Sequence, residues 1–139
     1  GITAAMNARK AGRSCRITGV ELNSSAVKDA IGNAALNKLD NIRFTCADAG
    51  DFMTELAARR ERADVVFMDP PRTGSDTRFL SCLTRLAPSR IVYISCGPDT
   101  LARDLKYLTR KGYAVERMSG VDLFPMTKHC EVVCGLTKR

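Results

Sequence analysis

Short apolar runs alternate along this chain with stretches in which apolar residues recur at helical spacing. The runs are rich in β-branched residues and are bounded mostly by Gly, Pro, Asp or Asn, which is typical of strands. Strands are expected over 16–22, 42–46, 64–68, 91–94, 113–118 and 131–136. Between them, apolar stripes predict helices. These helices are expected at 4–11, after Ser24 or Ser25, after Asp51, over 79–86, and from Asp99 or Thr100 to Gly112.

The apolar residues of these stripes also predict which helix faces are buried. The helix over 79–86 and the helix that ends before Gly112 are expected to bury, respectively, Phe79, Leu80, Leu83 and Leu86, and Leu101, Leu105 and Leu108. In the second helix, Val27, Ala30, Ile31 and Ala34 share one face, with Ser24 or Ser25 as the N-cap. Asp51 is expected to cap the third helix. Gly112 is suited to the position after a helix C-terminus.

The order of strands and helices predicts an α/β fold. Parallel strands joined by helical crossovers form a doubly wound, Rossmann-like sheet, and the last two strands suit an antiparallel hairpin. The 139 residues are expected to form a single catalytic domain, 1–139. Because the chain lacks a starting Met and opens within a helical pattern, we interpret it as the C-terminal fragment of a longer protein.

Composition narrows the class of protein. The chain is 45% hydrophobic and 27% charged, as in globular domains, and has no apolar run of membrane-spanning length. Its net charge of +7 favours an anionic partner such as nucleic acid. None of the six cysteines forms a C-x-x-C pair, so we expect no metal site and reduced thiols in a cytoplasmic protein.

Polar residues stand at the ends of four predicted strands, where ligands bind in open α/β sheets. They are Glu21, Asp48, Asp69 (followed by Pro70-Pro71-Arg72) and Cys96. An acid at such a position either accepts hydrogen bonds from a ligand or caps a turn. A thiol facing a helix start is favoured as the nucleophilic thiolate, but a lone cysteine also suits a small core position.

The segment Asp122 to Glu131 contains the only histidine, His129, two residues before Glu131. In an extended segment these two side chains share a face. Glu131 is a candidate general base; the alternative is a salt-bridging residue of an exposed loop.

Together these strings resemble the RNA uracil-C5 methyltransferase family, which forms 5-methyluridine in ribosomal and transfer RNA. The matching pieces are Gly19-Val20-Glu21, Asp69-Pro70-Pro71-Arg72-x-Gly74, Ser95-Cys96-x-Pro98-x-Thr100-Leu101-Ala102-Arg103-Asp104, and Asp122-x-Phe124-Pro125-x-Thr127-x-His129-x-Glu131. Their order and spacing also agree with that family.

The resemblance implies a class I methyltransferase fold that uses S-adenosyl-L-methionine and acts on rRNA or tRNA. It assigns the nucleophile to Cys96 and the proton acceptor to Glu131. Glu21, Asp48 and Asp69 would belong to the cofactor site, with Asp69 also near the target base. Arg72, Lys128 and His129 are expected to contact the RNA, and the full-length enzyme is expected to be monomeric.

The chain also departs from the family pattern. No G-x-G-x-x-G motif is present, and the family's first motif and first strand are missing. In this family's fold that strand lies between the Glu21 strand and the Asp69 strand, so a rearranged or gapped sheet is expected. Gly97 stands where Asn is common after the cysteine.

Three alternatives follow from the same residues. An RNA cytosine-C5 methyltransferase has a second cysteine after the proline of the Asp69 motif, but here Pro71 and Arg72 follow. An amino-methyltransferase would have an aromatic residue in place of Arg72. An inactive or truncated RNA-binding scaffold remains compatible with the missing motif.

Overall fold

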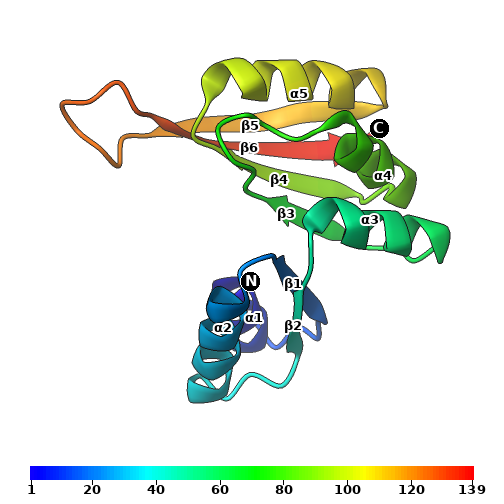
Figure 1. The fold of residues 1–139 in the computed structure, drawn as a ribbon, viewed down its shortest axis with the longest axis vertical. Helices are drawn as coiled ribbons and strands as arrows, with labels where there is room; N and C mark the ends of the chain where they lie inside the picture. Colours follow the sequence, from blue (N-terminus) through cyan, green and yellow to red (C-terminus); the bar gives the residue numbers. More distant parts are fainter. The chain divides into compact units, whose positions relative to one another are not determined.

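Helices and strands alternate along the computed structural model, which describes residues Gly1–Arg139 (Figure 1). The elements are α1 (Ile2–Lys10), β1 (Ile17–Glu21), α2 (Ser24–Leu36), β2 (Ile42–Cys46), α3 (Ala49–Ala58), β3 (Val65–Met68), α4 (Thr77–Leu86), β4 (Arg90–Ser95), α5 (Pro98–Arg110), β5 (Tyr113–Val121) and β6 (Glu131–Lys138). The predicted α/β class is confirmed.

The strands form two sheets rather than one. β1 pairs with β2 in parallel, whereas the second sheet has the order β3-β4-β6-β5. In the second sheet β3 and β4 are parallel, and β6 runs antiparallel to both β4 and β5. The expected C-terminal hairpin is therefore confirmed. As the missing strand leads one to expect, no ladder joins the two sheets, because β1 pairs only with β2 and β3 only with β4.

The chain divides into two compact units, Gly1–Phe52 and Met53–Arg139. The first unit has a small core, formed by residues of α1, α2, β2 and the segment between α2 and β2. Its buried residues are Ala5, Ala34, Leu39 and Ile42. A core of this size provides little apolar burial, which is the main stabilising contribution to a small unit.

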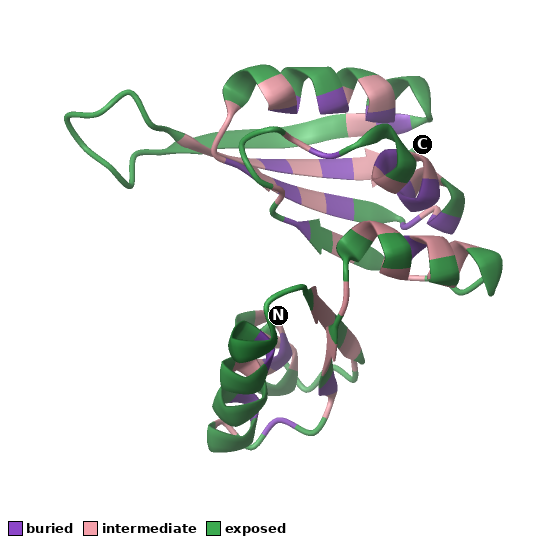
Figure 2. Ribbon diagram, in the orientation of Figure 1, coloured by how far each residue is buried: buried purple, intermediate pink, exposed green.

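The second unit has the larger core, which lies between α4, α5 and the sheet (Figure 2). α4 buries Leu80, Leu83 and Leu86, in agreement with the predicted stripe. α5 buries Leu101 and Leu108. These side chains pack against the sheet positions Ile91, Tyr93, Cys134 and Leu136. The core thus holds α5, and the turn that precedes it, against β4.

Helix boundaries differ from the sequence prediction where two polar residues compete as caps. Asn23, not Ser24 or Ser25, caps α2, with its side chain accepting from the amides of Ser25 and Ala26. The prediction for Asp51 is also wrong, since α3 begins at Ala49 and Asp48 accepts the Asp51 amide. The residue that caps a helix is decided by its backbone geometry. When several neighbouring residues are all of capping type, the sequence does not show which of them has that geometry.

Two further local results matter. Gly112 follows α5 with a φ of +91°, as expected for the residue after a helix end. Ile31 of α2 is 53% exposed, which contradicts its predicted inward position.

Helix length and side-chain clustering bear on membrane insertion and metal binding. All of the helices in the structure are too short or too polar to cross a membrane. The structure contains no group of three or more His, Cys, Asp or Glu side chains that could hold a metal ion.

Candidate active site

Cys96 occupies the turn between β4 and α5. It directly follows Ser95, the last residue of β4, and α5 starts two residues later at Pro98. The Ser95 hydroxyl closes this turn, since it accepts from the Gly97 amide at 3.1 Å and donates to the Gly97 carbonyl at 3.1 Å. The thiol is half-buried. The predicted place of Cys96, at a strand end before a helix, is thus observed.

The pairing of β4 with β6 brings Glu131 to the same place. The last pair of this antiparallel ladder is Ser95 with Val132. Cys96 follows the first of these residues and Glu131 precedes the second, so they flank the pair on the same side. Facing backbones in such a ladder lie about 5 Å apart. A thiol and a half-buried carboxylate therefore share one end of the sheet.

The loop after β3 lies beside the Cys96 turn. Asp69 follows Met68, the last residue of β3, and is exposed. The Thr100 hydroxyl, in the first turns of α5, lies 2.9 Å from the Arg72 carbonyl and 3.0 Å from that of Gly97. One side chain thus bridges the loop that carries Arg72 and the turn that carries Cys96.

Arg72 also reaches the long loop between β5 and β6. Its Nη2 atom lies 2.9 Å from His129 Nδ1. The same Nη2 atom lies 3.4 Å from His129 Nε2, so the guanidinium, which only donates, lies against the nitrogen atoms of the ring. The Phe124 ring meets the His129 ring edge to face, with centroids 6.4 Å apart. Lys128 in the same loop is exposed.

Within the second unit, the structure therefore brings together most of the predicted site residues. These are Asp69, Arg72, Cys96, Lys128, His129 and Glu131, all on the loops and strand ends at one edge of the sheet. Cys130, between two of them, is exposed, whereas Cys134 is buried in the core. Burial raises the pKa of the Cys134 thiol, which is the opposite of what a nucleophile requires.

Glu21 and Asp48 belong to the first unit and lie at one edge of its parallel pair. Glu21 ends β1, and one of its carboxylate oxygens accepts the Asn23 amide at 2.8 Å. Asp48 follows β2 by two residues and accepts the Asp51 amide at 3.0 Å. Both acids are exposed. Each fits the turn-capping alternative with one oxygen, and the carboxylates also suit donors such as ribose hydroxyls.

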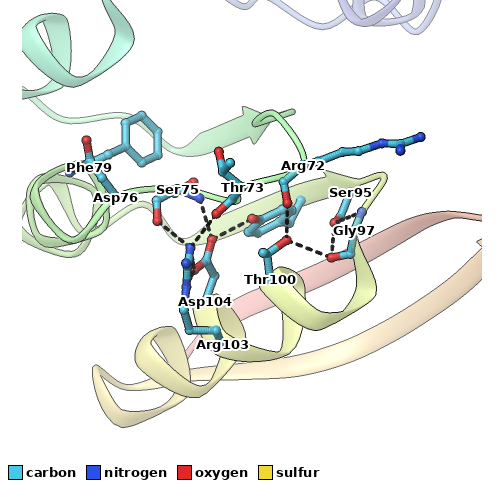
Figure 3. A network of polar contacts seen from close by, with 11 residues as sticks. Arg72, Thr73, Ser75, Asp76, Phe79, Ser95, Gly97, Thr100, Arg103 and Asp104 are labelled. Carbon is cyan, nitrogen blue, oxygen red and sulfur yellow. Dashed lines mark hydrogen bonds and ion pairs between the residues drawn. The ribbon is translucent and has the colours of Figure 1, made fainter.

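Residues of the matching string from Ser95 to Asp104 to which the sequence assigned no role lie in a polar network behind this edge (Figure 3). The network includes Thr100, Arg103 and Asp104 of α5, of which Asp104 is completely buried. Their spacing, one polar face at i, i+3 and i+4 beside the leucines of the same helix, was the available signal. A charged residue at a core-facing helical position requires a partner.

Comparison with known proteins shows which family the chain belongs to. Residues 7–139 match the family described as tRNA (Uracil-5-)-methyltransferase. The chain belongs to this family. An uncharacterised RNA methyltransferase of Geobacter sulfurreducens is 43% identical over 129 residues, which are 93% of this chain and 26% of that protein. A second, from Enterococcus faecalis, is 42% identical over 99% of this chain and 29% of its own length.

Among solved structures, the chain is similar to the Pyrococcus abyssi tRNA (uracil-54, C5)-methyltransferase in complex with S-adenosyl-L-homocysteine. The TM-score is 0.79 and the identity 33%, over 99% of this chain and 31% of that one. The class I methyltransferase fold expected from the sequence is therefore confirmed. The chain spans less than a third of the length of these relatives.

Proposed function

We propose that this chain is the catalytic part of an S-adenosyl-L-methionine-dependent enzyme that methylates carbon 5 of a uridine in RNA. The observation that carries the proposal is the β4–β6 register. Its last pair is Ser95 with Val132, so Cys96, which follows β4, comes opposite Glu131, the first residue of β6. Membership of the tRNA (uracil-5-)-methyltransferase family supports the same reaction. The Pyrococcus abyssi enzyme, solved with S-adenosyl-L-homocysteine, supports the cofactor.

In this reaction Cys96 attacks first. Its thiolate adds to carbon 6 of uracil, and the ring electrons move to give an enolate that is nucleophilic at carbon 5. Carbon 5 of that enolate accepts the methyl group. Glu131 then takes the proton from carbon 5, the double bond between carbons 5 and 6 re-forms, and the carbon–sulfur bond breaks to release the thiolate. A thiol and a carboxylate at the same end of one ladder suit these two steps.

The remaining residues bind and orient. Asp69, held by two prolines, would contact the target base, and Arg72, Lys128 and His129 would contact the RNA from the two loops. The target base must leave its stack to reach a half-buried thiol. S-adenosyl-L-methionine, when bound, would supply an electrophilic methyl group, with the electrons of the broken carbon–sulfur bond remaining on sulfur in the leaving S-adenosyl-L-homocysteine. Exposed carboxylates at the ends of β1 and β2 suit its hydroxyl and amine donors, so Glu21 and Asp48 would hold it.

Substitution of the two central residues tests this mechanism in the full-length protein. We expect Cys96→Ala to abolish formation of 5-methyluridine, because no adduct at carbon 6 forms. Glu131→Gln is expected to accumulate a covalent protein–RNA adduct, because the carbon 5 proton is not removed. Mass spectrometry of digested RNA measures the first outcome, and denaturing gel electrophoresis with labelled RNA the second.

The matched control is Cys15→Ala, which removes another half-buried thiol, from the first unit, and should leave methylation intact. Persistent methylation by Cys96→Ala contradicts the assignment of the nucleophile. Failure of Glu131→Gln to accumulate an adduct contradicts the assignment of the base. RNA binding without methylation by the wild-type protein supports the scaffold alternative, and 5-methylcytidine supports the cytosine alternative.

The choice between rRNA and tRNA, a cytoplasmic location and a monomeric full-length enzyme stay predictions. A transcript series of both RNA classes, mapped for 5-methyluridine, resolves the substrate.

A further inference from the structure

A network of polar contacts joins the loop after β3 to α5 and β4 (Figure 3). On the helix side it consists of Thr100, Arg103 and Asp104, which face the loop from adjacent turns of α5. None of these three side chains is part of the reaction described above. The network nevertheless lies directly behind Arg72 and the Cys96 turn.

Asp104 is the centre of the network and is 0% exposed. One carboxylate oxygen accepts from the Ser75 amide at 2.8 Å and from the Tyr93 hydroxyl at 2.7 Å. The other accepts from Arg103 Nε at 2.9 Å, and Arg103 Nη2 lies 2.8 Å from it. The carboxylate is therefore fully supplied with donors, as a buried charge requires.

Arg103 connects this carboxylate to the loop backbone. The same Nη2 atom donates to the Thr73 carbonyl at 3.1 Å and to the Ser75 carbonyl at 2.9 Å. The Arg103 side chain is 57% exposed, in contrast to Asp104. Together the pair holds both an amide and two carbonyls of the loop, which fixes its backbone and not merely one side chain.

The loop also packs closely against α5. Gly74 has a φ of +72°, and a Cβ atom there would lie 2.6 Å from Arg103 Nη2 and 2.9 Å from Asp104 Oδ2. A Cβ atom on Gly97 would lie 3.0 Å from the Arg72 carbonyl. Glycine at both positions permits the loop and the Cys96 turn to approach each other.

We propose that Arg103 and Asp104 are positioning residues, which set the loop of Arg72 relative to the turn of Cys96. This inference rests on the proposed function. A buried carboxylate is seldom the most stabilising way to fill a core position, so stability alone does not explain Asp104. It fixes the geometry of two segments that must act on the same base. Through the contact of Arg72 with His129, the position of the loop is passed on to the β5–β6 loop.

Arg103→Ala in the full-length protein tests the proposal, because this exposed side chain is removed without leaving a cavity in the core. Asp104 then loses its ion pair and the loop loses two carbonyl contacts. We expect kcat per folded enzyme, measured well below the melting temperature, to fall at least about tenfold, since small misplacements of reacting groups are costly. The KM for S-adenosyl-L-methionine should change less than about twofold, because binding is little affected.

Two companion variants refine this test. Arg103→Lys retains the charge but not the guanidinium fork, so it should recover part of the lost kcat. Arg110→Ala removes another exposed arginine from α5 and should leave kcat unchanged. An unchanged kcat in folded Arg103→Ala, or a fall in melting temperature with no fall in kcat, overturns the proposal.

Amide hydrogen exchange separates this inference from the proposed function. We expect the Ser75 amide to exchange faster in Arg103→Ala than in wild type or Arg110→Ala, whatever reaction the enzyme performs. Equal exchange rates overturn the positioning role even if wild type makes 5-methyluridine. If wild type makes none, the proposed function fails, and faster exchange still supports the attachment of the loop to α5.

Discussion

At the scale of single residues, the Tyr93 side chain shows how the interior behind the site is organised. Its hydroxyl is completely buried and donates to Asp104. Burial first, and then the hydrogen bond to the Asp104 carboxylate, raise the pKa of Tyr93 well above its ordinary value of 10.0. A phenol that stays protonated remains a donor, so the carboxylate retains its partner.

This raised pKa predicts how stability depends on pH. In the unfolded chain Tyr93 loses its proton near pH 10, whereas the folded protein retains it, so the unfolded state binds fewer protons above that pH. The stabilisation is complete below pH 10 and is lost as pH rises toward the raised pKa. Denaturant unfolding at about pH 9 and about pH 11 should show a decline to which Tyr93 contributes up to about 1.4 kcal/mol per pH unit.

The comparison variant is Tyr93→Phe. Its free energy of unfolding should decline less steeply with rising pH than that of wild type. Part of the slope remains, because burial also raises the pKa of Tyr113 and of Cys134. An identical slope in Tyr93→Phe contradicts the argument.

At the scale of elements, the helices differ in how clearly their sequences form an apolar face and in how much of that face is buried. α4 and α5 have clear apolar stripes and bury them, and their predicted faces agree with the structure. α2 buries only Val27 and Ala34 and exposes Ile31. It also contains Gly32, an exposed helical position at which an added Cβ would meet nothing within 4 Å.

Gly32→Ala should therefore stabilise the first unit. Alanine loses less backbone freedom than glycine when it becomes helical, which is worth about 0.5 to 1 kcal/mol in the free energy of unfolding. Circular dichroism during thermal unfolding measures the gain. Gly12→Ala is the matched control, because it also has open space but a φ of +64°, so it should destabilise instead. Stabilisation by both substitutions would contradict this account.

At the scale of the whole molecule, charge is the property that bears on the proposed substrate. The net charge of +7 suits a polyanion, and the family matched by this chain acts on RNA by its description. Exposed basic side chains that neutralise phosphates release counterions, so binding of RNA should weaken as salt is raised. The binding of ligands of low charge depends much less on the salt concentration.

We expect the Kd of the full-length Cys96→Ala variant for RNA to rise at least about tenfold between about 50 and about 200 mM salt. The Kd for S-adenosyl-L-homocysteine should change less than about twofold over the same range, since that ligand carries no phosphate chain. Filter binding and calorimetry measure the two constants. A salt-independent Kd for RNA contradicts a phosphate-based interface.

The sequence by itself determined the order of helices and strands, the faces of α4 and α5, and the strand-end positions of Glu21, Asp69 and Cys96. These are local properties, because hydrophobic periodicity and turn residues act within a few positions of one another. Motifs read in this way also pointed to the family, which the comparisons bear out.

Tertiary structure decided what depends on distant segments. The register of β4 with β6, which sets Glu131 beside Cys96, joins residues 35 positions apart in the sequence. The cap at Asn23 and the burial of Asp104 beneath the Ser75 loop are likewise results of packing. Strand pairing and buried charge compensation depend on partners that only folding brings together, so no local pattern in the sequence specifies them.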